Sequence, residues 1–404
     1  MGKVIIIGQN YNTSLGLIKS VGEGGLKCAT LKFRKNSSFI RTLFQVILSP
    51  DLCSKYVDEW VALPREPEEE LINGLIENFG DKICKKVILP ADDYCSLILD
   101  KNYQLLSDYF FIPHITNCNH SLGYYMDKQN QKVIAGNCGI NISQTWSVKI
   151  CKDEKPLIPE NLIYPCITKP QSSVGLPKSY IQKCNNEKEL KNLLNSFSEE
   201  TSCEILIEEY IEVEEEFTIP GISDGVNVLI PSFLKKKVIG TGSHKGVTIC
   251  GKVEHSSLYK DECSKLVLLM KSIGYNGIFD IEMLKSGNKF YLNEINFRNG
   301  AAGYSLTKSG INLPSIYVNY LLNSIPFPTT VILSKGLTFV NDKAALDHYI
   351  AGECTKSGYN TLVNSVDIRL IDNKDDRFAQ MSFKFLRLKL LFVKFINNLK
   401  YKNK

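Results

Sequence analysis

The sequence predicts an α/β protein with two or three compact units, and three observations lead to this fold class. Its 404 residues are too many for one small hydrophobic core. Near the start, short apolar strands alternate with amphipathic helices, which is typical of a parallel sheet covered by helices. Further along, "GIFDIEML" and "KFYLNEIN" form a hairpin across the turn "KSGN", so we expect α+β structure in that part.

The strand–helix pattern first appears in "KVIIIGQNYNTSLGLIKSVGEGG" and is repeated in "KKVILPADDYCSLIL". Each stretch is typical of a buried strand, a polar turn and a helix. We therefore assign residues 1–115 to an N-terminal α/β domain. The helix that begins in "MDKQNQKVIAG" belongs to a second domain, residues 120–325. The stretch "SIPFP" separates this domain from a C-terminal region, residues 326–404.

The bulk composition excludes several classes of protein. Hydrophobic residues make up 44% and charged residues 23%, as in a soluble globular enzyme. The net charge of +5 is too small to indicate nucleic-acid binding by itself. The sequence has no secretory signal and no run of about twenty apolar residues, so we expect a cytoplasmic protein without membrane-spanning helices. Thirteen scattered cysteines without a CxxC pair argue against a structural zinc site.

The stretch "YLNEINFRNG" has the clearest chemical pattern. Glu294, Asn296 and Arg298 occupy alternate positions of a strand, so their side chains share one face. Glu282 lies on the other strand of the predicted hairpin and can meet them there. Carboxylate and amide oxygens suit Mg²⁺, which takes its remaining ligands from water and substrate phosphates. The alternative interpretation is a set of solvated surface side chains.

Two further stretches are compatible with nucleotide binding. In "YPCITKPQSSVGLPK", Lys169 ends an apolar strand and a loop of serine and glycine follows, which would offer a fixed charge and N–H groups to phosphate. In "ILIEEYIEVEEEFTI", a strand leads into a hinge with Glu208 and Glu216 at its two ends. Backbone groups at a hinge can bind an adenine edge, and a carboxylate can accept hydrogen bonds from ribose. The alternatives are a plain turn and an acidic solvated loop.

Together, the order "MDK", "KPQSSVG", "EEYI…EFT" and "NEIN" resembles that of the ATP-grasp superfamily, as in D-alanine–D-alanine ligase. The resemblance covers roughly residues 120–325, and the N-terminal domain resembles the superfamily's pre-ATP-grasp domain. The stretches "VIIIG", "EINFRNG" and "TKSGINLP" resemble the carboxylate–amine ligase branch, which includes D-aspartate ligase and capsule-locus enzymes. The fold implied is a pre-ATP-grasp parallel α/β domain, then an ATP-grasp fold, then a small C-terminal unit.

The resemblance implies a set of ATP-binding positions. Lysines would hold the phosphates, a loop of small residues would cover them, a hinge would contact adenine, and a carboxylate would bind the ribose. These positions are Lys128, Lys169, Ser172, Ser173, Gly175, Glu208, Ile211, Glu216 and Lys236. The last comes from the run "LKKKV", in which strand alternation lets only one or two lysines face inward.

The resemblance also implies the metal ligands Glu282, Glu294 and Asn296, with Asp280 competing for the first place. The metal would be Mg²⁺, with Mn²⁺ as an alternative. Arg298 would hold the acyl phosphate or the substrate carboxylate, and with Lys169 it is the predicted catalytic residue. No catalytic triad is expected.

The implied activity is ATP-dependent ligation of a carboxylate to an amine through an acyl phosphate, which gives ADP and phosphate. An amino acid and a cell-wall or surface-polysaccharide precursor are the substrates that the resemblance suggests. Two alternatives stay open: an ATP-grasp ligase that modifies a peptide or metabolite, and a nucleotide-binding module without catalysis. A homodimer is common in such enzymes, although no residue here indicates one.

The C-terminal stretch "FAQMSFKFLRLKLLFVKFINNLKYKNK" predicts a basic amphipathic helix. One interpretation is a helix packed on the core with a basic outer face. The other is an interfacial helix in peripheral contact with an anionic membrane. The basic residues that support both are Lys384, Arg387, Lys389, Lys394, Lys400 and Lys402.

Overall fold

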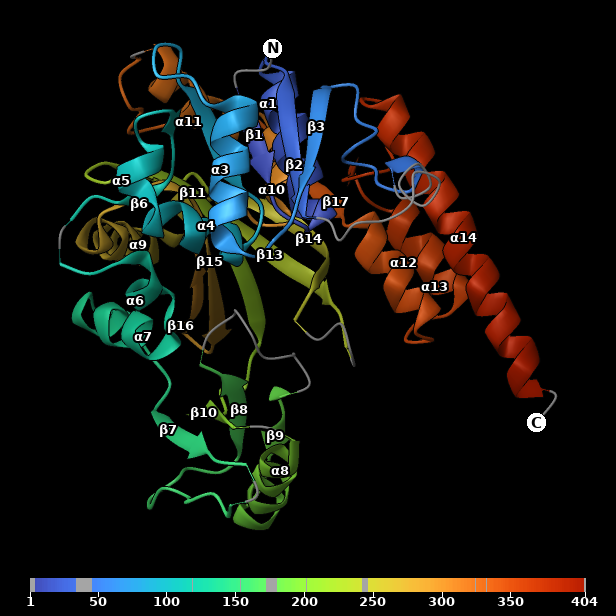
Figure 1. Cartoon of the computed structure of the whole chain (residues 1–404). Helices are drawn as coiled ribbons and strands as arrows, with labels where there is room; N and C mark the ends of the chain where they lie inside the picture. The colour runs from blue at the N-terminus through green and yellow to red at the C-terminus, as the bar shows by residue number, and fades with distance from the viewer. Residues whose placement is uncertain are drawn as a thin grey trace.

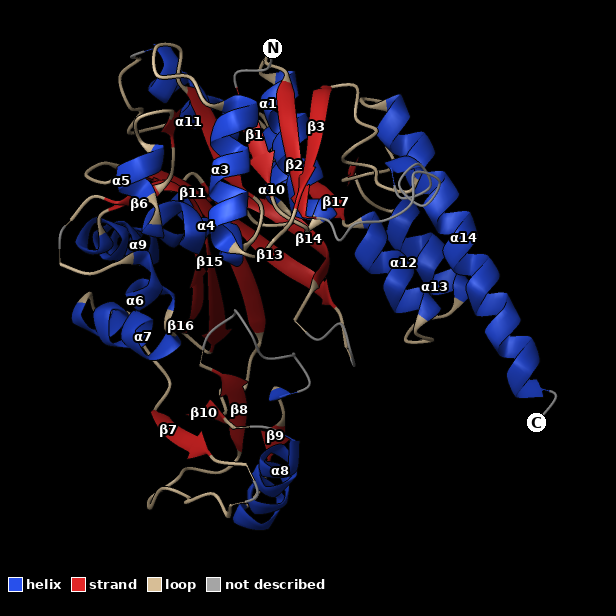
Figure 2. Cartoon of the chain, viewed as in Figure 1, coloured by secondary structure: helices blue, strands red, loops and turns tan. Residues whose placement is uncertain are grey.

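The computed structural model of the chain describes residues 4–33, 46–117, 119–152, 154–171, 180–200, 202–241, 246–323, 325–331 and 333–402. In this part of the chain the strands form a five-stranded, a four-stranded and a nine-stranded sheet. Figures 1 and 2 show the five-stranded sheet at the top, the nine-stranded sheet in the middle and the four-stranded sheet at the bottom. The predicted α/β class, with hairpins in its second part, is confirmed.

The N-terminal sheet is covered by helices on both faces. Its strands are β1 (Val4–Ile7), β2 (Cys28–Phe33), β3 (Val57–Leu63), β4 (Lys86–Pro90) and β5 (Phe110–Phe111), and its helices are α1 (Tyr11–Glu23), α3 (Glu68–Phe79), α4 (Asp93–Lys101) and α5 (Tyr103–Leu106). The order is β3-β2-β1-β4-β5, and every neighbouring pair is parallel. Val4 and Ile6 pack toward α1, whereas Ile5 and Ile7 pack toward α3 and α4, because successive strand residues point to opposite faces.

The nine-stranded sheet is the scaffold of the second domain. Its strands are β6 (His114–Ile115), β11 (Glu215–Asp224), β12 (Val228–Leu229), β13 (Ser232–Ile239), β14 (Thr248–His255), β15 (Tyr275–Ser286), β16 (Lys289–Asn296), β17 (Thr338–Val340) and β18 (Ile368–Arg369). Helices α6 (Leu122–Met126), α7 (Lys128–Asn137) and α9 (Lys260–Ile273) share a hydrophobic core with β11, β15 and β16. The predicted hairpin β15–β16 is confirmed, and its turn places Gly287 at φ 55°, which glycine adopts without steric cost.

The four-stranded sheet forms a separate small body below the large sheet (Figure 1). Its elements are β7 (Thr145–Ile150), β8 (Cys166–Pro170), β9 (Lys183–Cys184), α8 (Glu187–Glu200) and β10 (Cys203–Glu209). The order is β7-β10-β8-β9, with antiparallel pairs throughout, and α8 packs on it. The strands predicted in "YPCITKP" and "EILIEEYI", with a helix between them, are therefore confirmed.

The C-terminal region adds both strands and helices. Its helices are α12 (Asp342–Ile350), α13 (Lys356–Asn364) and α14 (Arg377–Lys402), and they follow α10 (Gly303–Lys308) and α11 (Leu313–Asn323). Because β17 pairs with β14 and β18 with β17, this region shares the large sheet with the second domain. The predicted C-terminal helix is present as α14, and its end extends beyond α13 (Figure 1). Among the described residues, no helix is both long and apolar enough to cross a membrane.

Candidate active site

A cavity of about 1380 Å³ is lined by the four-stranded sheet, the large sheet, the N-terminal domain and α12. Every predicted site residue that the structure describes lines this cavity. These residues are Lys128, Lys169, Glu208, Ile211, Glu216, Lys236, Glu282, Glu294, Asn296 and Arg298. Ser172, Ser173 and Gly175 lie outside the described residues. The fold therefore brings segments that are far apart in the sequence to one place.

Oxygen-bearing side chains gather on one face of the β15–β16 hairpin. Glu282 lies directly opposite Glu294, and Asp280 lies directly opposite Asn296, so each pair shares a face. A register shift after Glu282 leaves Asn293 as an extra residue, which is a β-bulge. Two facing carboxylates and an amide oxygen thus point into the same cavity.

This set of oxygens fits a Mg²⁺ ion that is shared with phosphate. Glu282, Glu294 and Asn296 offer the hard ligands that Mg²⁺ prefers. Among the described residues, no group of three or more His, Cys, Asp or Glu could hold a metal by itself. A Mg²⁺ ion at this place would take further ligands from water and substrate. Burial, and then the charge of Glu282, raises the pKa of Asp280 to about 7. Asp280 and Glu282 both line the cavity, so both carboxylates are candidates for the first place.

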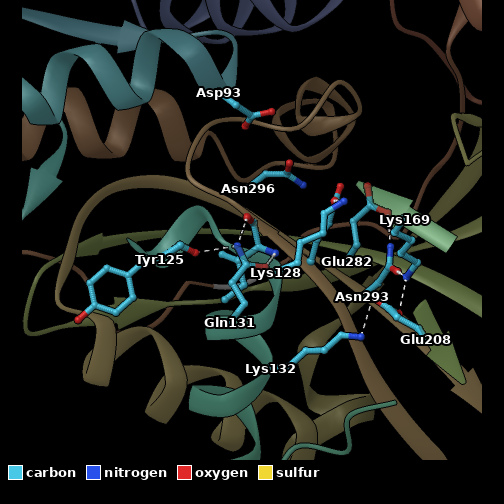
Figure 3. A network of polar contacts seen from close by, with 12 residues as sticks. Asp93, Tyr125, Lys128, Gln131, Lys132, Lys169, Glu208, Glu282, Asn293 and Asn296 are labelled. Atoms are coloured by element: carbon cyan, nitrogen blue, oxygen red, sulfur yellow. Dashed lines mark hydrogen bonds and ion pairs between the residues drawn. The ribbon is translucent and has the colours of Figure 1, made fainter. Parts of the chain in front are cut away.

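Lysines converge on Glu208 from two elements (Figure 3). Lys132 Nζ on α7 lies 2.7 Å from Glu208 Oε1, and Lys169 Nζ on β8 lies 2.9 Å from Oε2. Burial would raise the pKa of Glu208, but the charges of Lys169 and Lys132 outweigh it and lower this pKa to about 2. Lys128 pairs with Glu294 at 3.2 Å. Each of these three lysines therefore has a carboxylate partner before any ligand is bound.

Lys236 is the inward-facing member of the run of three lysines. Its side chain is 1% exposed and its Nζ lies 3.1 Å from Glu282 Oε2 and 3.3 Å from Glu216 Oε2. Burial would lower the pKa of Lys236, but the charges of Glu282 and Glu216 outweigh it and raise this pKa. Lys235 instead pairs with Glu215, as expected for the neighbouring residue of a strand.

Arg298 follows β16 and is held by the N-terminal domain. Its Nε lies 3.1 Å from Asp93 Oδ1 at the start of α4, and its Nη2 donates to Asn296 Oδ1 at 3.0 Å. Burial would lower the pKa of Arg298, but the charges of Asp93 and Asp280 outweigh it, so the guanidinium stays cationic. A fixed guanidinium beside the oxygen ligands suits a phosphoryl group or a carboxylate.

Two residues of the polar network were not predicted from the sequence. Lys132 follows Lys128 by four residues, which places both on one face of α7, so the spacing in "MDKQNQK" could have indicated it. Asn293 Oδ1 accepts from Lys169 Nζ at 2.9 Å, and Asn293 Nδ2 donates to Glu282 Oε2 at 3.4 Å. The bulge residue Asn293 therefore links Lys169 to Glu282 (Figure 3).

The N-terminal domain and α12 supply further polar lining. Asn10 Oδ1 caps α1 by accepting from the N–H groups of Asn12 and Thr13. The buried atoms Asn12 Oδ1 and Thr13 Oγ1 have no hydrogen-bond partner within the described residues. Buried polar atoms are normally hydrogen-bonded, so these two are exceptions among the described residues. The residues of this lining are Asn10, Asn12, Thr13, Asp93, Asn341 and Asp347.

Sequence comparison gives a partial match. No family model matches the sequence. A stretch of 188 residues is 27% identical to the carbamoyl phosphate synthase large chain of Clostridium botulinum. The stretch covers 44% of this chain but only 16% of that protein.

Solved structures share the fold over most of its length. L-amino acid ligase from Bacillus licheniformis has a TM-score of 0.57 and 17% identity, over 83% of this chain and 78% of that one. The ADP complex of N5-carboxyaminoimidazole synthetase from Staphylococcus aureus has a TM-score of 0.60 and 17% identity, over 87% of this chain and 85% of that one. Biotin carboxylase from Campylobacter jejuni has a TM-score of 0.59 and 17% identity, over 84% of this chain and 75% of that one. The fold implied by the sequence resemblance is therefore confirmed, and the chain has the ATP-grasp fold.

Proposed function

We propose that the protein is an ATP- and Mg²⁺-dependent ligase that joins a carboxylate to an amine. The observation that carries the proposal is the single cavity in which buried lysines, two facing glutamates and a fixed arginine meet. The ATP-grasp fold supports it, because its solved neighbours include an L-amino acid ligase and a synthetase in complex with ADP. The intact set of Lys128, Lys169, Glu282, Glu294, Asn296 and Arg298 argues against a module that only binds nucleotide.

In this proposal, ATP lies between the four-stranded sheet and the large sheet. Lys128, Lys169 and Lys236 bind its phosphates, and in doing so they exchange part of their contacts with carboxylates for contacts with phosphate oxygens. Glu216 accepts hydrogen bonds from the ribose, and the hinge from Glu208 to Ile211 offers backbone groups to adenine. The loop with Ser172, Ser173 and Gly175 covers the phosphates.

Glu282, Glu294 and Asn296 would hold Mg²⁺ together with phosphate oxygens. When bound, the ion supplies charge neutralisation between the phosphates of ATP. Mn²⁺ has similar ligand preferences and would be an alternative. The pairs Lys128–Glu294 and Lys236–Glu282 pre-align these carboxylates in the absence of ligand.

The reaction has two steps. A carboxylate oxygen of the first substrate attacks the γ-phosphorus of ATP, the bond to ADP breaks, and an acyl phosphate forms. The amine then attacks the acyl carbon, loses a proton, and expels phosphate to leave an amide. Arg298 and Lys169 stabilise the charge of the transferred phosphoryl group, because positioning and electrostatics provide most of the catalysis in such transfers.

The substrates in this proposal are small molecules, one a carboxylate such as an amino acid and the other an amine. The sequence resemblance points to precursors of the cell wall or of surface polysaccharides. The polar residues Asn10, Asn12 and Thr13 line the cavity and support a polar substrate at the N-terminal domain. We place the enzyme in the cytoplasm, where ATP and reduced cysteines are found, and a homodimer is the assembly that the resemblance suggests.

The test is phosphate release from Mg-ATP by the purified protein with each L- and D-amino acid, alone and paired with amino-sugar or peptide acceptors. We expect release that depends on one acid. Glu294→Gln and Lys169→Ala should each lower turnover by about 10²–10³-fold, as for loss of one preorganised contact. Glu204→Gln and Lys149→Ala are matched controls, since these residues lie opposite each other on exposed positions of β10 and β7.

Near-normal turnover in Glu294→Gln or Lys169→Ala would contradict the assigned roles. Silence of the wild type across the panel, with Mg-ATP binding intact, would favour a nucleotide-binding module and contradict the ligase proposal for these substrates.

A further inference from the structure

The C-terminal helix α14 carries an exposed apolar stripe that the active site does not use. Its members recur at alternating intervals of three and four residues and are between 49% and 67% exposed. At about 100° a residue, they fall within about 100° of the helix circumference. The residues of this apolar stripe are Phe378, Met381, Phe385, Leu388, Phe392 and Phe395.

The opposite face of α14 already has its partners. Ala379 and Phe383 are fully buried, and Leu386 and Leu390 pack beside them on α12 and α13. Arg387 lies over the ring of Tyr359 at 5.3 Å. The helix is therefore fixed to the body by one face, and the apolar stripe is a surface of the folded protein. The inner face of α14 is packed on the core, as one of the two interpretations of the sequence stated. The outer face of the helix is apolar as well as basic.

Positive charge borders the apolar stripe on both sides. The sequence of α14 contains seven Lys and Arg and no Asp or Glu. By helical geometry, Arg377 and Lys384 lie along one edge of the stripe and Lys389 along the other. All three are exposed, and none forms an ion pair with another described residue. Such side chains can extend their charged ends outward while an apolar face is covered.

We propose that α14 lies in the plane of an anionic membrane surface, with the apolar stripe at the boundary of headgroups and acyl chains. A helix with a phenylalanine- and leucine-rich face and a basic border is typical of interfacial helices. A second copy of the chain is a poorer occupant, because two stripes face to face would bring their cationic borders together. Spanning the bilayer does not fit, since the described helices include none apolar enough.

The place of α14 connects this surface to the active site. The helix packs on α12, and Asn341 and Asp347 at α12 line the cavity. An enzyme docked through α14 therefore holds the lining of its cavity one helix away from the lipid surface. The inference stands on the surface of α14 alone and is independent of the ligase reaction.

The test is flotation of the full-length protein with vesicles of phosphatidylcholine, with and without phosphatidylglycerol. We expect the fraction of protein that floats with anionic vesicles to be at least tenfold above the fraction that floats with neutral ones. This fraction should fall as the salt concentration is raised. The double variants Phe385→Asp/Leu388→Asp and Lys384→Glu/Lys389→Glu should both lose this recovery. Leu268→Asp, at an exposed position of α9, is the matched control and should float like the wild type. Point variants are preferable to truncation, which would uncover the core beneath Phe383.

Recovery of Phe385→Asp/Leu388→Asp equal to that of the wild type would overturn the proposal. So would a wild-type dimer in light scattering that becomes monomeric in this variant without any vesicle binding, since the stripe would then be a self-interface. ATP turnover in solution should be unchanged in both double variants, so the outcome for the membrane surface can be separated from that for the ligase.

Discussion

At the scale of single residues, the charge balance of the cavity depends on Glu208. Its side chain is 3% exposed, and its two oxygens pair with Lys132 and Lys169. Burial lowers the pKa of Lys132 to about 8 even with this carboxylate beside it. Without Glu208, Lys132 and Lys169 would lose the carboxylate that they share in a buried site, which is far more costly than the loss of a partner by an exposed lysine.

We therefore expect Glu208→Gln to destabilise the fold by about 3–5 kcal/mol at pH 7, as for the loss of one partner of a buried ion pair. The pKa of Glu208 is lowered from 4.5 to about 2 on folding. Its contribution is therefore complete above pH 4.5 and is lost as the pH falls toward 2. Thermal unfolding midpoints of wild type and variant, measured from pH 7 down to pH 3, should differ most above pH 4.5 and converge below it.

Glu209→Gln is the control for this comparison. Glu209 is the next residue of β10, so its side chain leaves the opposite face of the strand. Its carboxylate accepts a long hydrogen bond from Gln144 N–H at 3.4 Å. The thermal unfolding midpoint of Glu209→Gln should stay close to that of the wild type. Equal midpoints for Glu208→Gln and wild type at pH 7 would show that the lysines do not depend on this carboxylate.

At the scale of elements, the bulge in β16 decides which side chains reach the cavity. Before it, Phe290 and Leu292 face the core, and after it Ile295 and Phe297 do so, which is a change of phase by one residue. Without the extra residue Asn293, the strand could not place both Leu292 in the core and Glu294 in the cavity. The bulge also brings the Asn293 side chain between Lys169 and Glu282.

We expect Asn293→Ala to weaken Mg-ATP binding about tenfold while the fold survives. The substitution keeps the length of β16, and with it the register of Glu282 opposite Glu294. It removes the hydrogen bond that fixes Lys169 Nζ, and bonds to charged groups contribute about 1.5–3 kcal/mol. Isothermal titration with a non-hydrolysable Mg-ATP analogue measures the change. The control Asn288→Ala, in the turn of the same hairpin, should bind the analogue like the wild type. A large drop in the unfolding midpoint of Asn293→Ala with unchanged affinity for the analogue would instead indicate a purely structural role for Asn293.

Local sequence patterns were sufficient for much of the fold and of the site. The alternation of Glu294, Asn296 and Arg298 predicted a shared face, and their partner Glu282 followed from the hairpin. The bulge was not predicted, although the apolar phase changes between Leu292 and Ile295. The Lys132–Glu208 pair could not be found by pattern, because its members are 76 residues apart and meet only when α7 and the small sheet are placed in space. For the same reason, packing alone showed which face of α14 stays exposed.

At the scale of the whole molecule, the cavity is a junction between bodies that are otherwise loosely joined. The four-stranded sheet connects to α7 through residues 138–144 and to β11 of the large sheet through residues 210–214. Across the junction the described contacts include polar ones: Lys169 with Asn293, and Gln171 with Asp127. Polar contacts that border a cavity are more readily exchanged for contacts to a ligand than a packed apolar core is. The arrangement therefore favours relative movement of the small body when a ligand enters.

Hydrogen exchange would test this coupling across the molecule. Binding of a non-hydrolysable Mg-ATP analogue should slow backbone exchange in residues 208–216 and in β8, because the nucleotide would bridge the small body to the large sheet and use amides of the hinge. Helix α3 packs in the separate core of the N-terminal domain and serves as the internal reference, with unchanged exchange. The same slowing should be absent in Lys169→Ala at equal analogue concentration. If calorimetry shows binding but protection appears only outside the hinge and β8, the nucleotide does not join the two bodies and the assigned ATP position is wrong.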